Sequence, residues 1–219
     1  MSKFLGSVVK VEGLTKSYGR LRVLNSLDIE VSRGEVAVIY GSNGSGKTTL
    51  QSIISSLTSP DAGVAEVCGR DTSIRSQMAR ELVGFVAHTP FLYEALTVKE
   101  NLLFFSRLYR LKGDPVDGEA FKRLISPLGL DERIDQRIDT LSHGYRKRVS
   151  IARALLHKPA VLLLDEPESG LDIRTMEIFE GIISDFTRSG GAALVTTHNR
   201  ASAYGDKVTF YNLQQGKLS

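Results

Sequence analysis

The stretch Gly41-Ser42-Asn43-Gly44-Ser45-Gly46-Lys47-Thr48-Thr49 decides the fold, because it fits the pattern G-x-x-x-x-G-K-[S/T] between two suitable elements. The apolar residues 36–40 before it predict a buried strand, and residues 48–56 after it carry apolar side chains at helical spacing. A strand, a glycine-rich loop and a helix in this order are typical of a phosphate-binding P-loop. These flanking elements disfavour the alternative, a glycine-rich surface turn.

Each residue type in this loop suits a nucleoside triphosphate with a magnesium ion. Glycines let backbone N–H groups approach phosphate oxygens, and the following helix adds the positive end of its dipole. We predict that Lys47 reaches the β- and γ-phosphates and that Thr48 offers its hydroxyl to Mg²⁺. All nine residues, 41–49, are therefore expected to bind the nucleotide.

Composition places the chain among ordinary globular proteins. It has 219 residues, 42% hydrophobic and 24% charged, with a net charge of +3 that gives little indication of an anionic partner. The single cysteine, Cys68, cannot form an internal disulfide and fits a reducing cytoplasm. No apolar segment is long enough for a signal peptide or a membrane span, so we expect neither export nor membrane insertion.

The strand patterns predict an α/β protein with a P-loop NTPase core. Short apolar runs at Val161–Leu164 and Ala192–Thr196 are typical of parallel strands covered on both faces, so we expect a mostly parallel sheet. The segments Val8–Leu14 and Leu27–Val31 alternate between apolar and polar residues, and Val64–Cys68 is expected to join them. These three segments predict an antiparallel β subdomain.

The segment Thr97–Leu156 has a helical pattern and predicts an inserted helical subdomain. We expect a single domain over residues 1–219. In this prediction the core and the β subdomain occupy residues 1–87 and 157–219, and the helical subdomain occupies about residues 88–156.

The run Val161-Leu162-Leu163-Leu164-Asp165-Glu166 consists of four apolar residues followed by two acids. Asp165 is suited to hold Mg²⁺ through water, and Glu166 to polarise the water that attacks the γ-phosphate. Taken alone, two acids at the end of a strand more often form a solvated turn.

Further motifs make the pattern specific. Leu141-Ser142-His143-Gly144 precedes the two acids, Ser169-Gly170-Leu171-Asp172 follows them, and His198 comes after another predicted strand. Together these motifs resemble the ATP-binding cassette (ABC) family: P-loop, signature sequence, Walker B strand with catalytic glutamate, D-loop and switch histidine. They occur in the family's order over essentially the whole chain.

The resemblance implies an ATPase whose two copies pack head to tail, with each ATP between one P-loop and the partner's signature sequence. A helix that begins at the signature would point its positive end at the γ-phosphate of the other copy. The implied site residues are Glu166, His198 and Lys47 for catalysis, Tyr18 for stacking on adenine, and Ser142 and Gly144 for the second copy's ATP.

Three positions depart from the family pattern. His143 and Tyr145 stand where glycine and glutamine are usual, and we expect activity to be retained because Ser142 and Gly144 are present. His88 stands where most members have a glutamine that senses Mg²⁺ and links ATP to the membrane partner. We keep His88 as a candidate metal ligand, and a pH-sensitive coupling is a hypothesis because imidazole titrates near neutral pH.

Histidine at position 88 and the short chain also resemble the ATPase subunit of the bacterial cytochrome c maturation haem exporter. The glutamine that commonly follows this histidine is Thr89 here, which departs from that subfamily.

The family resemblance favours an ATP-hydrolysing subunit that drives a separate integral membrane transporter subunit, as a homodimer on the cytoplasmic face of the membrane. Two alternatives stay open: a soluble ABC ATPase without a transport role, and an ATP-binding regulatory module that does not hydrolyse. Soluble members that act on DNA or ribosomes carry long coiled-coil insertions or two cassettes, and neither feature is present. The basic run Arg146–Arg148 lies at the start of a predicted helix without an aromatic platform, so we interpret it as a solvated helix face and expect no nucleic-acid partner.

The predicted helix after Thr97 is apolar on more than one face, from Leu102 to Leu111. Burial inside the helical subdomain and a groove for the membrane subunit both explain this pattern.

Overall fold

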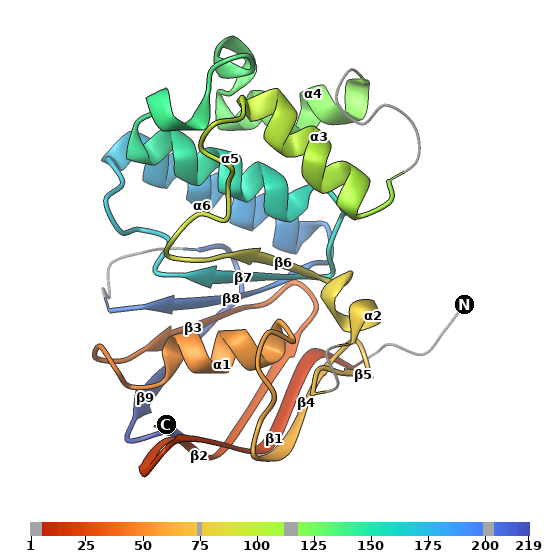
Figure 1. The fold of residues 1–219 in the computed structure, drawn as a ribbon. Helices are drawn as coiled ribbons and strands as arrows, with labels where there is room; N and C mark the ends of the chain where they lie inside the picture. Colours follow the sequence, from red (N-terminus) through yellow and green to blue (C-terminus); the bar gives the residue numbers. More distant parts are fainter. Residues whose placement is uncertain (1–5, 74–75, 112–117, 199–203) are drawn as a thin grey trace.

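The computed structural model describes residues 6–73, 76–111, 118–198 and 204–219. It contains two β-sheets with helix α1 between them and a layer of helices on the outer face of the larger sheet (Figure 1). The smaller sheet is antiparallel, in the order β2-β1-β4-β5. Its strands are β1 (Ser7–Tyr18), β2 (Leu21–Ser32), β4 (Ala62–Val67) and β5 (Arg70–Asp71).

The larger sheet has the order β10-β9-β3-β8-β7-β6, and all its neighbouring pairs are parallel except β9 and β10. Its strands are β3 (Val36–Tyr40), β6 (Val83–Val86), β7 (Val161–Asp165), β8 (Ala192–Thr197), β9 (Val208–Gln214) and β10 (Lys217–Leu218). This mixed arrangement confirms the predicted α/β fold class, with a mostly parallel sheet and an antiparallel one.

The α-helices connect these strands. They are α1 (Lys47–Ile54), α2 (Gln77–Arg80), α3 (Val98–Leu108), α4 (Glu119–Ile125), α5 (His143–Leu155) and α6 (Ile173–Arg188). Three short 3-10 helices lie between α4 and α5, at Ser126–Leu128, Asp131–Arg133 and Ile138–Thr140. Within the described residues, no helix is long and apolar enough to cross a bilayer.

Two hydrophobic cores lie on opposite faces of the larger sheet. In β3, Val36 and Val38 belong to the core under α5 and α6, whereas Ala37 and Ile39 belong to the core shared with α1 and the antiparallel sheet. Side chains of a strand alternate between faces, so a strand covered on both sides needs a continuous apolar run. The central strands therefore begin with an apolar run and become polar only at their carboxyl ends.

Helix α3 begins with a capping box. The Thr97 hydroxyl accepts a hydrogen bond from the backbone N–H of Glu100, and the Glu100 carboxylate accepts one from the backbone N–H of Thr97. Its apolar residues divide between the two interpretations, because Leu102 is buried whereas Phe104 and Leu108 are exposed.

Several boundaries differ from the sequence expectation. Strand β2 begins at Leu21, six residues before the expected start, and it pairs with β1 through a series of register shifts. Its first half contains exposed and charged positions, so the alternation is lost there. Strands β9 and β10 were not expected, because most of their side chains are partly exposed and form no apolar run. The division into subdomains at residues 88 and 156 stays a prediction.

Candidate functional site

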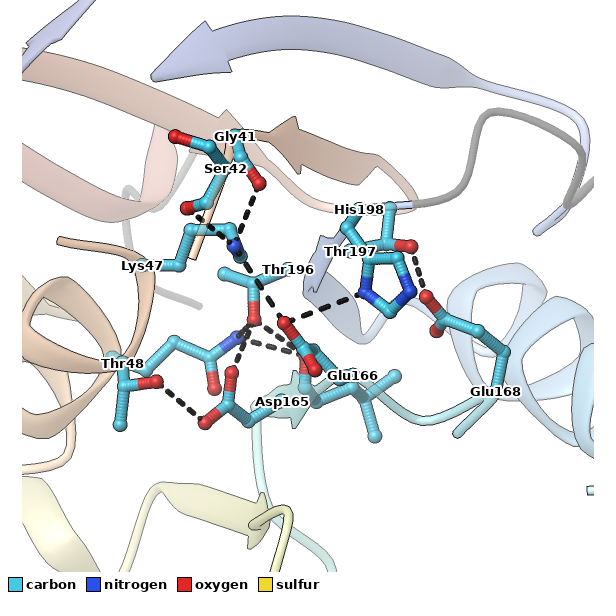
Figure 2. Close-up of polar contacts among 12 residues, drawn as sticks. Gly41, Ser42, Lys47, Thr48, Asp165, Glu166, Glu168, Thr196, Thr197 and His198 are labelled. Carbon is cyan, nitrogen blue, oxygen red and sulfur yellow. Dashed lines mark hydrogen bonds and ion pairs between the residues drawn. The ribbon is translucent and has the colours of Figure 1, made fainter. Parts of the chain in front are cut away.

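The predicted catalytic residues come from the carboxyl ends of three adjacent parallel strands (Figure 2). The P-loop follows β3, Asp165 ends β7 with Glu166 next to it, and His198 directly follows β8. Strand β8 lies between β3 and β7, so their ends meet at one edge of the sheet. In open α/β sheets, ligands bind at this edge.

The backbone of the P-loop requires glycine at two close approaches. A Cβ on Gly41 would lie 2.4 Å from the Ser45 hydroxyl oxygen, and one on Gly46 would lie 2.8 Å from a methyl of Leu24. Gly46 also has a φ of 110°, which side-chain-bearing residues rarely adopt. The loop is thus a tight backbone turn at a helix N-terminus, which fits a phosphate group.

Lys47 is buried and held by the loop that it follows. Its Nζ donates to the carbonyl oxygens of Gly41, at 2.7 Å, and Ser42, at 3.1 Å. The same Nζ lies 3.6 Å from Oε1 of Glu166. The ammonium group is therefore fixed between the P-loop and the end of β7.

Asp165 is buried, and both of its carboxylate oxygens accept hydrogen bonds. Thr48 donates to Oδ2 at 2.9 Å, and Thr196 donates to Oδ1 at 2.6 Å. The Thr48 hydroxyl and the Asp165 carboxylate are oxygen donors of the kind that Mg²⁺ prefers. This pair could therefore hold the ion.

Glu166 has an unusual backbone. Its φ is 45°, in the left-handed region, and its N–H donates to the carbonyl oxygen of Thr196 at 2.9 Å. Such a conformation is uncommon and costly for a residue with a side chain, and it persists where the surroundings enforce it. Oε1 of Glu166 lies 3.6 Å from Nδ1 of His198. The strand end therefore brings Lys47, Glu166 and His198 together.

A cavity of about 620 Å³ adjoins this cluster. Tyr18, at the end of β1, lines it and is half-exposed, and His88 lines it together with Asp165 and Glu166. The other described lining residues are Leu21, Val23, Asn43, Gly44, Gly46, Lys47, Thr48 and Thr49. An aromatic side chain, the P-loop and two acids thus line one cavity, which suits a nucleotide.

The signature residues lie apart from this cavity. Ser142 caps α5, its hydroxyl accepting from the backbone N–H of Tyr145 at 3.4 Å, and Gly144 lies in the first turn. Neither residue is among those described as lining the cavity. The signature residues therefore do not share this cavity with the P-loop of the same chain.

The residues that depart from the family pattern make contacts within the chain. His143 Nε2 lies 3.2 Å from the carbonyl oxygen of Ser169. The ring of Tyr145 faces the guanidinium groups of Arg133, at 5.3 Å, and Arg148, at 4.8 Å.

Sequence reasoning missed three polar residues around the site. Gln51 is buried, and its Nε2 donates to the Leu164 carbonyl oxygen at 2.8 Å and to Thr196 Oγ1 at 3.0 Å. Glu168 accepts a hydrogen bond from Thr197 Oγ1 (Figure 2). Lys147 is buried in α5, where its Nζ donates to the Ala87 carbonyl oxygen at 3.3 Å, and burial lowers its pKa despite the attraction of nearby carboxylates. Lys147 and its neighbour Arg148 are buried, so the basic run does not form the expected solvated face. A polar residue at an apolar position of a helix was the available signal for Gln51 and Lys147.

Known proteins resemble this chain in sequence. A family model described as ABC transporter matches residues 24–169. The probable multidrug ABC transporter ATP-binding protein YbhF of Escherichia coli K12 is 35% identical over 213 residues, which cover 97% of this chain and 36% of YbhF. The chain thus spans about a third of that relative's length. The lipoprotein-releasing system ATP-binding protein LolD of Bacteroides fragilis is 34% identical over 204 residues, covering 90% of this chain and 93% of LolD.

Solved structures resemble it as well. An ATP-binding subunit of an ABC transporter superimposes with a TM-score of 0.88 at 28% identity, over 97% of this chain and 88% of that one. An ATP-binding cassette in a dimeric post-hydrolysis state, bound to ADP and Pi, gives a TM-score of 0.81 at 27% identity over 96% of each chain. With the motifs in order, the strand-end cluster and these likenesses, the chain belongs to the ABC transporter family as one of its ATP-binding cassettes.

Proposed function

We propose that the chain hydrolyses ATP and drives a separate integral membrane subunit of an ABC transporter. The observation that carries this proposal is the meeting of Lys47, Glu166 and His198 beside the Thr48–Asp165 pair. A module that only binds ATP would need the P-loop but not a carboxylate aimed at the γ-phosphate position.

Each residue has a role in this proposal. Lys47 exchanges its bonds to the loop carbonyls for β- and γ-phosphate oxygens, and bound Mg²⁺ would neutralise charge on those phosphates. Thr48 and Asp165 would hold the ion. Glu166 accepts the proton of the attacking water as the water oxygen bonds to the γ-phosphorus. The bond from the γ-phosphorus to its bridging oxygen breaks, so that ADP leaves, and His198 orients the γ-phosphate and the water.

A second copy would complete the site. Ser142 and Gly144 lie exposed or half-exposed at the N-terminus of α5, where N–H groups and the helix dipole favour an anion. We therefore place the γ-phosphate of one copy against the α5 N-terminus of the other. A similar cassette is a dimer in a post-hydrolysis state bound to ADP and Pi, which supports a dimer as the acting form.

The membrane subunit is expected to bind near α3. Phe91, Tyr93, Phe104 and Leu108 expose between 40% and 64% of their surface there. The Tyr93 and Phe104 rings pack edge to face with centroids 4.8 Å apart, so these two side chains form one contiguous patch. Through this contact the chain would lie on the cytoplasmic face of the membrane.

The transported substrate is a further part of the proposal. The relatives are named for multidrug transport, lipoprotein release and Nod factor export, so their names point to no common cargo. Export of haem for cytochrome c maturation is the specific candidate, and it rests on the histidine at position 88. Purification from native membranes in mild detergent, followed by mass spectrometry, tests it. Haem-handling proteins beside an integral membrane partner would support haem export, and another membrane partner alone would contradict it.

The Glu166→Gln variant tests hydrolysis. Removing the general base should lower kcat by about a hundredfold or more while ATP binding persists. Phosphate release and binding of a fluorescent ATP analogue measure the two effects, and the exposed Glu132→Gln serves as the control that should leave both unchanged. A wild-type chain that binds ATP without turnover would instead identify a regulatory module.

A further inference from the structure

The side chains of Glu168 and His143 hold the turn that follows Glu166. The Glu168 carboxylate and the backbone carbonyl of its neighbour Ser169 each accept a hydrogen bond from a different functional element. One bond leads to the end of β8, and the other leads to the start of α5.

The Glu168 carboxylate accepts a hydrogen bond from the hydroxyl of Thr197, the last residue of β8. Thr197 directly precedes His198, so this bond restrains the backbone that carries the switch histidine. The second carboxylate oxygen of Glu168 is buried and has no hydrogen-bond partner among the described residues. A buried carboxylate oxygen without a partner is costly, which argues that this side chain is kept for a purpose other than stability.

His143 holds the same turn from the other side. Its Nε2 lies 3.2 Å from the Ser169 carbonyl oxygen, and because a carbonyl only accepts, Nε2 must carry the proton. The ring also packs on Gly170, where an added Cβ would lie 3.0 Å from the imidazole. The usual glycine at position 143 could make neither contact.

Charge compensation supports the same arrangement. The buried ammonium group of Lys147, one turn along α5 from His143, is attracted by Glu168 as well as by Asp165 and Glu166. Thus α5 contributes a cation toward the acids of the strand end as well as a hydrogen bond to the turn.

We propose that Glu168 and His143 are positioning residues that connect the switch histidine of one ATP site to the signature surface that the same chain offers to the other site. The connection runs from His198 through Thr197 and Glu168 to Ser169, His143 and Ser142, with a single peptide bond between its two hydrogen bonds. A shift at His198 on ATP binding or hydrolysis would therefore displace the signature serine. This inference rests on the proposed ATPase function.

A double-mutant cycle on the full-length chain tests the connection. Glu168→Ala and His143→Ala should each lower kcat for ATP by about threefold to tenfold, the equivalent of one lost hydrogen bond, with KM little changed. The double variant should be hardly slower than either single variant, because both changes interrupt one path. Glu168→Gln keeps an acceptor for Thr197 and His143→Gln keeps an N–H donor, so both should recover most of the rate.

The controls separate loss of coupling from loss of fold. Thermal unfolding of each variant shows whether it is folded, and Glu81→Ala, an exposed acid on the surface, should leave kcat unchanged. The connection would be overturned if the effects of the two alanine variants multiplied in the double variant. It would also be overturned if the alanine variants left kcat unchanged, or if the glutamine variants failed to recover the rate. A wild-type chain without ATP turnover would instead overturn the proposed function itself.

Discussion

The end of the central sheet and the surface of helix α5 hold their polar side chains in different ways. At the sheet end, backbone groups fix the side chains. Lys47 donates to two backbone carbonyl oxygens, and the left-handed φ of Glu166 sets the direction of its side chain. On α5, contacts between rings and guanidinium groups add to such bonds: Tyr145 faces two guanidinium groups, and Arg153 lies near two aromatic rings while it donates to the Phe85 carbonyl oxygen. Two of the three departures from the family pattern, at positions 143 and 145, belong to the α5 side.

This difference predicts two kinds of mutational effect. Changes at the sheet end should impair nucleotide chemistry and leave the fold intact, because the backbone persists when a side chain is replaced. Changes at Tyr145 and Arg153 of α5 should mainly alter stability, because ring contacts and buried charge contribute to packing there.

Lys47→Ala should have the largest effect. Losing a buried ammonium group that binds phosphate should weaken ATP binding by about a hundredfold, with little change in thermal unfolding. Titration with a fluorescent ATP analogue measures the first quantity and calorimetry the second. The exposed Lys10, paired with Glu12 on the antiparallel sheet, provides the matched control Lys10→Ala. Retained affinity in Lys47→Ala would contradict the placement of the triphosphate at the P-loop.

Arg153→Ala should lower the stability of the fold rather than impair nucleotide binding. The Arg153 guanidinium donates to the carbonyl oxygen of Phe85 and lies 5.5 Å from the ring centre of Phe91 and 5.2 Å from that of Phe105. Removing a buried side chain with these contacts should lower the free energy of unfolding by about 2 kcal/mol. Chemical denaturation of the purified chain measures it.

The control for Arg153 is Arg188→Ala, which removes an exposed ion pair with Asp206. Exposed pairs contribute less than about 1 kcal/mol. Equal losses in the two variants would show that α5 derives no special stability from its buried arginine.

The sequence predicted the backbone elements of the sheet end better than the side-chain hydrogen bonds of either region. The P-loop and the ends of β7 and β8 were visible because glycine spacing and apolar runs are local patterns. The bonds from Gln51 to Leu164 and from Glu168 to Thr197 join residues that are distant in the chain, and no local pattern encodes such a pairing. His143 was visible as a departure, but its partner Ser169 was not.

The strands show the same limit. Strand β9 was missed because most of its side chains are partly exposed, although it pairs in parallel with β3 along its length. Pairing with a neighbour, rather than an apolar run, places this segment in the sheet.

Tyr145→Gln restores the usual family residue on the α5 side. It removes the ring that faces Arg133 and Arg148, which should cost about 1 kcal/mol of unfolding free energy and leave kcat nearly unchanged. Denaturation and phosphate release measure the two effects. Tyr145→Phe keeps the ring and should keep the stability, and a large fall in kcat with either variant would place Tyr145 in the ATP site.

His157, just after α5, should give the smallest effect, and only at acidic pH. Its Nε2 lies 3.1 Å from the carbonyl oxygen of Val83, its Nδ1 is buried without a partner among the described residues, and its ring stacks on Tyr109 at 4.0 Å. Burial lowers the pKa of His157 below its ordinary value of 6.5. Protonation at Nδ1 would place a buried N–H group where it has no acceptor.

The sign of the pH effect follows from proton binding. Below about pH 6.5 the unfolded chain takes up a proton at His157 that the folded chain does not, so stability that is complete above this pH is lost as pH falls through the lower folded pKa. Between about pH 7.5 and about pH 6 the wild type should lose less than about 1 kcal/mol more unfolding free energy than His157→Phe, which keeps a ring against Tyr109 but cannot titrate. The exposed His88, His143 and His198 are present in both proteins and cancel in the comparison. An equal loss of unfolding free energy in the wild type and in His157→Phe would show that groups other than His157 cause the acid sensitivity.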